Sequence, residues 1–303
     1  MNTMNTMNTM ISHRLPEFKE TSARILFMGA ACVCILAVVL ICLFLLVNGV
    51  PAIAEIGLFE FLSGTTWRPA SSQYGIAPMI VGSLYVTAGA LIIGIPFGLL
   101  TAIYMARFAS PRVLRIMRPA MELLAGIPSV VYGFFGLMLI IPLIRLFSEK
   151  VLGAGVPGMS ILAASLLLGI MVLPTIITVS YASLKAVPES YYEGGLALGA
   201  NHERCVFKLV VPAAGSGIMA GIILGMGRAV GETMAVIMVI GNQPRMPTGL
   251  LEGARTLTGN IVLEMGYAAD LHRGALIGTA VVLFVFILLI NVLFYLLSRK
   301  VRS

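Results

Sequence analysis

Six apolar segments, each long enough to cross a lipid bilayer, constrain this chain more than any other feature. On a span-length window they cover about 25–47, 76–106, 121–147, 159–183, 209–240 and 275–297. A transmembrane helix needs about 20 mostly apolar residues. Only 11% of this chain is charged, whereas soluble domains carry about 25% charged residues. The sequence therefore predicts an all-α polytopic membrane protein whose residues 25–298 form one six-span domain.

The two ends of the chain read as short tails. The amino terminus repeats a polar tripeptide, MNTMNTMNTM, and such low-complexity sequence predicts a disordered tail over 1–24. The first apolar run is too long for the core of a signal peptide, which favours an uncleaved first span. Residues 299–303 form the second tail.

Lysine and arginine are distributed unevenly between the segments that flank the spans. With the amino terminus in the cytoplasm, thirteen of the twenty fall on cytoplasmic segments and six on outside segments, and Arg228 lies within a span. Cytoplasmic loops usually carry this excess. We therefore expect both termini in the cytoplasm and two long outside loops, at about 48–75 and 241–274, which serve a partner, a gate or only as a cap.

Several function classes find no support in the sequence. The net charge of +7 comes without a basic stretch that interleaves with aromatics, so nucleic acid is not an expected partner, while membrane lipid is. His202 and Cys205 share a loop, but two ligands do not make a zinc site, and no metal site is expected. The spans hold no Ser/His, paired-Asp or HExxH arrangement, so no catalytic residues are assigned.

The fifth span carries Arg228 and Glu232 near its middle. Charge at bilayer depth costs about 2.5 to 3.5 kcal/mol per residue, so these residues should face protein, water or substrate. Four residues apart on a continuous helix, the two side chains can touch. An arginine there suits an anion in transit, whereas a permanent ion pair that fixes the helix register is the structural alternative. Glu122 in the third span is a further candidate for the pathway, or it pairs with nearby arginines at the inner surface.

Glycines recur every four residues in the same span, at Gly217, Gly221 and Gly225, and again at Gly227 and Gly231. Small residues at this spacing let helices approach closely. Tight packing in a bundle is the favoured account of them.

The cytoplasmic loop after the fourth span resembles a motif of binding-protein-dependent permeases, the membrane subunits of ATP-binding-cassette importers. That motif reads EAA, three residues, G, nine residues, I, one residue, LP. The chain matches it at Glu193, Gly194, Gly195, Gly199, Leu209, Val211 and Pro212. The resemblance implies the type I importer permease fold, with this loop as a short coupling helix that docks on a separate ATPase. Both alanines of the motif are glycines here, and each glycine lowers helix stability by about 0.8 to 1 kcal/mol relative to alanine.

Longer stretches are similar to the phosphate-specific branch of these permeases, in its PstC form. They are Pro119 to Gly136, Ala197 to Ile218, Met226 to Asn242 and, outside, Trp67 to Leu84. The resemblance implies a bacterial plasma-membrane complex with a second permease subunit (PstA-like), two ATPase subunits (PstB-like) that bind ATP and Mg, and a phosphate-binding protein (PstS-like). It also places Arg228 and Glu232 on the family's GRAxGET motif.

The chain lacks a Gly-rich loop that ends in Gly-Lys-Ser/Thr, so a partner must supply the energy for transport and this chain needs no cofactor of its own. An importer of another oxyanion, such as molybdate or sulfate, is the nearest alternative function. A self-sufficient channel or secondary carrier is a more distant one.

Overall fold

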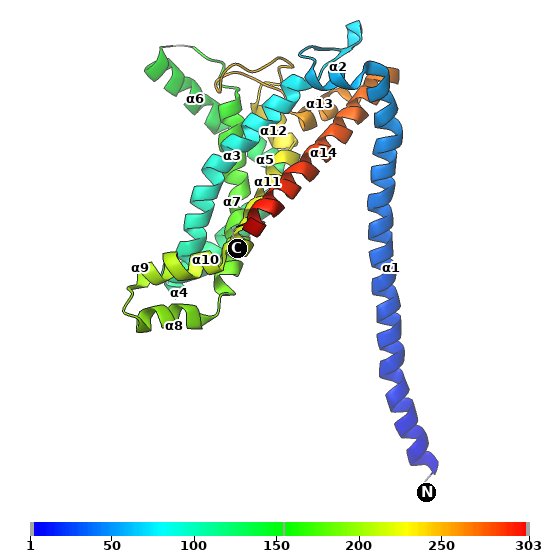
Figure 1. The fold of residues 1–303 in the computed structure, drawn as a ribbon, viewed down its shortest axis with the longest axis vertical. Coiled ribbons are helices and arrows are strands. Elements are labelled where there is room, and N and C mark those ends of the chain that lie inside the picture. The colour runs from blue at the N-terminus through cyan, green and yellow to red at the C-terminus, as the bar shows by residue number, and fades with distance from the viewer. Residues whose placement is uncertain (1–2, 154, 301–303) are drawn as a thin grey trace.

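The computed structural model describes the backbone of residues 3–153 and 155–300, and side chains from Ala23 onward except at 151–152, 294–295 and 297–300. This part of the chain is a helical bundle with one small two-stranded hairpin (Figure 1). In chain order the elements are α1 (Thr3–Ile56), α2 (Leu58–Ser63), β1 (Trp67–Arg68), the 3-10 turn η1 (Pro69–Ser71), β2 (Gln73–Tyr74), α3 (Ala77–Ile103), η2 (Tyr104–Phe108), α4 (Pro111–Gly126), α5 (Ser129–Phe135), η3 (Gly136–Ile140), α6 (Ile141–Phe147), η4 (Ser148–Leu152), α7 (Ile161–Lys185), α8 (Glu189–Ala197), α9 (His202–Cys205), η5 (Val206–Val210), α10 (Val211–Ala213), α11 (Gly215–Gly231), α12 (Met234–Val239), α13 (Leu257–Glu264) and α14 (Asp270–Lys300), where η2 to η5 are π-helical.

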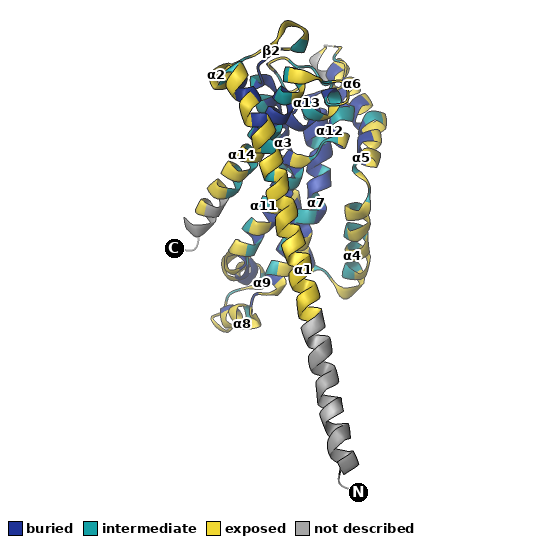
Figure 2. Ribbon diagram, turned by 90° about the vertical axis from the view of Figure 1, so that its right-hand side faces the viewer, coloured by how far each residue is buried: buried dark blue, intermediate teal, exposed yellow. Residues whose placement is uncertain are grey.

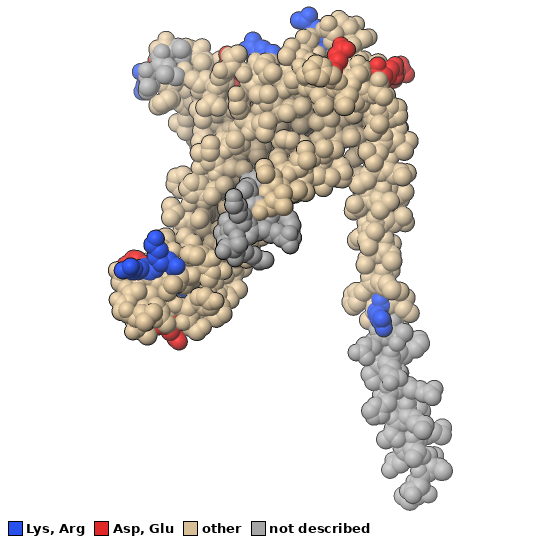
Figure 3. Space-filling model, viewed as in Figure 1, with Lys and Arg blue, Asp and Glu red and all other residues tan. Residues whose placement is uncertain are grey.

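The structure agrees with the six-span prediction if one bent pair of helices is counted as a single span. Five helical stretches are long and apolar enough to cross a bilayer: Ala23–Ile56, Ala77–Phe108, Ser129–Lys150, Ile161–Lys185 and Asp270–Leu293. The sixth is the pair His202–Ala213 and Gly215–Gly231, which bends by 68° at Ala214. On the face drawn in Figure 3, charged side chains gather toward the two ends of the bundle and leave an uncharged belt between them.

Two predicted spans differ from the structure at breaks in the chain. The predicted third span, 121–147, is divided, because α4 ends at Gly126 and α5 begins only after Pro128. A proline disfavours helical backbone at the residue before it, and Ile127 is indeed extended. The predicted fifth span, 209–240, is divided at Glu232 and Thr233, where α11 ends and α12 begins.

The amino-terminal helix is longer than the sequence predicts. Helix α1 begins at Thr3, so the backbone described from that residue on is helical where the sequence predicts a disordered tail over 1–24. Extending an existing helix needs no new nucleation, which makes such an extension inexpensive. Figure 1 shows α1 standing apart from the bundle over most of its length and meeting α2 and α14 at its carboxyl end. At the other terminus α14 continues to Lys300, while 301–303 of the predicted tail lie outside the described residues.

Helix α7 forms the centre of the bundle and is mostly buried, whereas α1 is exposed over most of its described length and buried only near its carboxyl end, at Gly49, Ala52 and Ile53 (Figure 2). Glycines of two neighbours let them pack directly on α7. A Cβ at Gly94 of α3 would lie 2.6 Å from Val172, and one at Gly225 of α11 would lie 2.8 Å from Ile176. Gly217 and Gly221 also face α7, so the close-packing prediction is confirmed for these three glycines of α11. Gly227 and Gly231 face open space.

Candidate functional site

Arg228 lies in the last turn of α11 and is half-buried. Arg228 interacts electrostatically with the Tyr132 hydroxyl of α5. That hydroxyl donates a hydrogen bond to the Leu124 carbonyl of α4 at 2.8 Å. Within the described part of the chain, no carboxylate lies within ion-pair distance of Arg228. A cation therefore remains in a membrane-spanning helix without an acidic partner.

Glu232 does not form the predicted contact with Arg228. The spacing of four residues places two side chains together only on a continuous helix, and α11 ends at Gly231, with Glu232 in extended conformation (φ −68°, ψ 131°). The carboxylate of Glu232 instead accepts hydrogen bonds from the backbone N–H groups of Thr233 (3.2 Å) and Ala235 (3.3 Å). It thus satisfies the N–H of the residue before α12 and one of the free N–H groups in its first turn.

Glu122 lies on α4 rather than in the third span, and it is exposed. It lines a pocket of about 280 Å³ between α4, α7 and η2, together with Arg118 and Tyr181. Arg118 donates a hydrogen bond to the Tyr181 hydroxyl, and its guanidinium lies 5.3 Å from the centre of that ring. Glu122 forms no ion pair with Arg228 among the described residues, and it shares this pocket with a different arginine.

The predicted coupling helix is present as α8, at the end of the bundle opposite the hairpin (Figure 1). Pro188 precedes it, and Gly199 follows it with φ +81°, a backbone conformation that glycine adopts at little cost. Glu193 and Leu198 are exposed, and Leu198 retains 91% of its accessible surface. An apolar side chain at the tip of an exposed helix is suited to contact with another protein.

The two glycines that depart from the family motif have different surroundings. Gly195 is buried, and a Cβ there would lie 2.6 Å from Leu209 and 2.8 Å from the Cys205 sulfur. Gly194 has no atom within 4 Å of the same position, apart from its own helix and chain neighbours. Gly195 therefore lets α8 pack closely on α9 and η5, which lead to Pro212 in α10.

A polar and aromatic cluster also holds α8, and sequence reasoning did not find it. The Arg107 guanidinium donates to the Glu189 carboxylate at 2.9 Å and lies 5.5 Å from the centre of the Tyr192 ring. The Tyr192 hydroxyl is 2.7 Å from Nδ1 of His202, whose ring packs against Phe108. The start of α8 is thus linked to η2 and α9.

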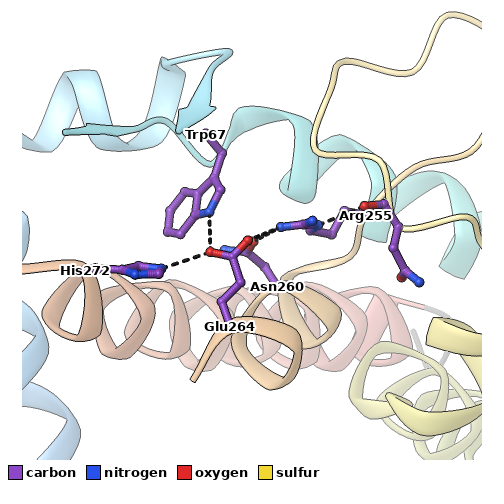
Figure 4. A network of polar contacts seen from close by, with 6 residues as sticks. Trp67, Arg255, Asn260, Glu264 and His272 are labelled. Carbon is purple, nitrogen blue, oxygen red and sulfur yellow. Dashed lines mark hydrogen bonds and ion pairs between the residues drawn. The ribbon is translucent and has the colours of Figure 1, made fainter. Parts of the chain in front are cut away.

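A second group that sequence reasoning missed surrounds Glu264 at the opposite end of the bundle (Figure 4). Its carboxylate accepts hydrogen bonds from Trp67 Nε1 at 2.9 Å and from Arg255 at 2.5 Å, and lies 2.9 Å from His272 Nε2. Arg255 also donates to Asn260 at 3.0 Å. The network joins β1, the loop before α13, α13 itself and the start of α14.

The charge of Glu264 is maintained in spite of its burial. Burial by itself would raise the pKa of this carboxyl, but the hydrogen bonds from Trp67, Arg255 and His272 together hold that pKa below its usual range. The sequence indicated this network only weakly, because Trp67, Arg255 and Glu264 occur in long polar loops.

Metal ligation finds no support in the part of the chain that the structure describes. No three His, Cys, Asp or Glu side chains there lie close enough to hold a metal ion. His202 is engaged with Tyr192, and the buried Cys205 thiol contacts the Ala200 carbonyl at 3.8 Å.

Comparison with known proteins shows the family to which the chain belongs. The family model described as "Binding-protein-dependent transport system inner membrane component" matches residues 94–303. The chain therefore belongs to this family, and it is a multi-pass permease subunit of an ATP-binding-cassette importer.

Individual relatives match most of the chain. A probable ABC transporter permease protein of Bacillus subtilis, YqgH, is 38% identical over 98% of both chains. The phosphate transport system permease protein PstC of Haemophilus influenzae is 33% identical over 80% of this chain and 82% of its own. The probable PstC protein of Methanocaldococcus jannaschii is 32% identical over 94% of both.

Solved structures agree on the fold. A chain of the MetNI methionine ABC transporter in an inward-facing conformation superimposes with a TM-score of 0.56, covering 78% of this chain and 99% of that one at 19% identity. A chain of an amino acid ABC transporter gives a TM-score of 0.53 at 20% identity, with the same coverage. At these identities the likeness supports the fold of the bundle alone.

Proposed function

We propose that this chain is a PstC-like permease subunit that carries inorganic phosphate across a bacterial plasma membrane into the cytoplasm. Several relatives that match most of the chain are named phosphate transport permeases. In this proposal α8 and both termini lie in the cytoplasm, in agreement with the uneven distribution of lysine and arginine. The hairpin and α13 then lie at the outer face.

The observation that carries the proposal is the unpaired guanidinium of Arg228. Transfer of a bare phosphate ion through an apolar barrier is prohibitively costly. A guanidinium keeps its charge at any depth and presents a planar fork of donors that matches phosphate oxygens. Because no carboxylate within the described residues neutralises Arg228, an anion that reaches the break after α11 meets an available cation.

Glu232 has a separate role in the proposal. Its carboxylate is engaged by the backbone of α12, so it fixes the break between the two helices close to Arg228 rather than cancelling the charge of that residue. An oxygen of the same carboxylate is also a hydrogen-bond acceptor for the proton that phosphate retains near neutral pH. Sulfate has no such proton, so this contact would favour phosphate.

The energy for transport comes from partners. Membership of the family implies an ATPase and a binding protein, and we propose a complex with a PstA-like second permease, two PstB-like ATPases that hold ATP and Mg, and a PstS-like phosphate receptor. The exposed end of α8, with Glu193 and Leu198, is the proposed contact with the ATPase. Its hinge at Gly199 and its packing through Gly195 on Leu209 link that contact to α10 and α11.

Uptake of labelled phosphate by the assembled complex tests the proposal. Arg228→Ala should reduce initial uptake by about 10- to 100-fold, since a hydrogen bond to a charged group contributes about 1.5 to 3 kcal/mol. The matched control is Arg24→Ala, which removes an exposed arginine of α1 and should transport normally. Normal uptake by Arg228→Ala in a correctly assembled complex would exclude this residue from the pathway.

Two further measurements separate the alternatives. Competition by molybdate or sulfate at equal concentration would identify an importer of another oxyanion. Transport by this chain alone in liposomes, without an ATPase, would identify a channel or a secondary carrier.

A further inference from the structure

A pocket of about 400 Å³ opens between the hairpin and the segment that follows α12, away from Arg228. Its lining is Thr65, Thr66, Trp67, Arg68, Gln243, Pro244 and Arg245. The side chains from the two rims offer two guanidinium groups, two hydroxyls and an amide, and no acidic residue lines it. This composition is typical of a site for an anion.

Both arginines are available to a ligand. Within the described residues, neither guanidinium donates a hydrogen bond or forms an ion pair. One acidic residue, Glu252, interacts electrostatically with Arg245. Its carboxylate is engaged by the hydroxyl (2.8 Å) and the N–H (3.2 Å) of Thr248, so it does not occupy the arginine.

Gln243 adds an unsatisfied group to the same pocket. Its side-chain oxygen is buried and has no hydrogen-bond partner among the described residues. A buried polar atom without a partner costs about 1 to 3 kcal/mol. A ligand that still carries a proton, as phosphate does, would donate to this oxygen, and the amide nitrogen would donate to a ligand oxygen if the group were rotated.

The hydrogen bonds around Glu264 fix the positions of the two sides of the pocket relative to each other (Figure 4). On one rim, Trp67 donates to Glu264 at 2.9 Å. On the other, Arg255 bonds both Glu264 and the carbonyl of Asn242, the latter at 3.1 Å. One buried carboxylate thus fixes the backbone next to Arg68 and next to Gln243, so the donors of the pocket are arranged before a ligand arrives.

We propose that this pocket binds a free oxyanion of the phosphate class at the outer face, before the anion reaches Arg228. The inference rests on the proposed function for its orientation and its ligand. The site is separate from the Arg228 region, so phosphate would be passed between two arginine-containing sites.

Trp67 reports on the pocket directly, because it lines it and is the single tryptophan of the chain. The test titrates the purified full chain with inorganic phosphate at constant ionic strength and follows Trp67 emission. We expect a saturable change, with an apparent Kd raised at least about tenfold in Arg68→Gln/Arg245→Gln, since each hydrogen bond lost is to a charged group. The matched control, Arg145→Gln/Arg273→Gln, removes the same charge at positions outside the pocket lining and should respond as the unmodified chain does.

Each possible result of the titration either supports or overturns the proposed phosphate site. An absent or non-saturable change, or one that the Arg68 and Arg245 substitutions leave intact, overturns the proposal. A change that appears only when a purified binding protein is added overturns it too, in favour of a carboxylate of that protein as the occupant.

The Arg228→Ala variant separates this proposal from the proposed function. If it keeps the Trp67 response and transports normally, the pathway through Arg228 is wrong and the pocket stands. If Trp67 does not respond while Arg228→Ala reduces uptake as expected, the pocket is wrong and the function stands.

Discussion

Replacing Gly195 by alanine tests how α8 is held against the rest of the bundle. On an open helix this change would stabilise α8 by about 0.8 to 1 kcal/mol. In the structure the new Cβ would lie 2.6 Å from Leu209 Cδ1 and 2.8 Å from Cys205 Sγ, and overpacking of this kind costs about 1 to 3 kcal/mol. The end of the Leu209 side chain can move aside, whereas Cys205 is fully buried. The expected net effect is a loss of up to about 2 kcal/mol.

Hydrogen exchange of the amides of α8 measures this effect in the purified protein. A loss of 2 kcal/mol corresponds to roughly 30-fold faster opening, and Gly195→Ala should approach that value. Gly194→Ala is the matched control: its Cβ meets open space, so only the helix preference remains and exchange should slow by about four- to fivefold. Adding Cys205→Ala to Gly195→Ala removes one colliding atom and should recover part of the protection.

The reasoning fails if the two alanine variants behave alike. Equal slowing would mean that α8 does not pack on Cys205 and Leu209 as the structure has it. Equal acceleration would mean that helix preference has no influence at this site.

Three other changes follow from contacts of the same kind. Glu264→Gln should cost about 1.5 to 3 kcal/mol of stability at neutral pH. Because the pKa of Glu264 is lowered in the folded protein, the stability difference between the two proteins should persist above the ordinary carboxyl pKa of about 4.3 and vanish as the pH falls through the lowered pKa. Thermal unfolding measured as a function of pH would reveal or refute this dependence. Gly225→Val should lower the thermal midpoint because its side chain meets Ile176, whereas Gly227→Val on the same helix meets open space and should be nearly neutral; equal losses would contradict the packing. Gly199→Leu strains a backbone at φ +81° by about 1 to 2 kcal/mol and should reduce stimulation of ATP hydrolysis by loaded binding protein; unchanged stimulation would remove the loop from coupling.

The sequence predicts the spans well because each depends on its own composition. The fourth span was expected at 159–183, and α7 covers Ile161–Lys185. The close-packed glycines of α11 were also predictable, since their spacing is local. A helix at α8 was predictable from a spaced motif and from Pro188 at its start, while its coupling role stays a prediction.

The breaks in the spans were not predictable in the same way. Pro96 and Pro174 lie inside continuous helices, whereas Pro128 follows a break. A proline alone does not tell these cases apart, because neighbouring helices decide whether the freed backbone groups are satisfied. The expected contact between Arg228 and Glu232 was wrong for this reason: it assumed a helix that in fact ends at Gly231.

The Glu264 network was beyond sequence reasoning because its parts are far apart in the chain. Trp67 and Glu264 are separated by 197 residues. No local pattern in either loop indicates that the tryptophan and the carboxylate meet. The assignments of Arg228, Glu232, Glu122 and the coupling residues to transport stay predictions until they are tested.

The contacts of α7 also limit how such a permease can move. Gly94 and Gly98 bring the backbone of α3 against Val172 and Ile176 of α7, and Gly221 and Gly225 bring the backbone of α11 against Val179 and Ile176 of the same helix. Interfaces this dense resist sliding, because interdigitated atoms must separate before they can shift. We therefore expect these three helices to stay packed together during transport, with any rearrangement at the interruptions around them: the bend at Ala214 and the helix breaks near Pro128 and Thr233.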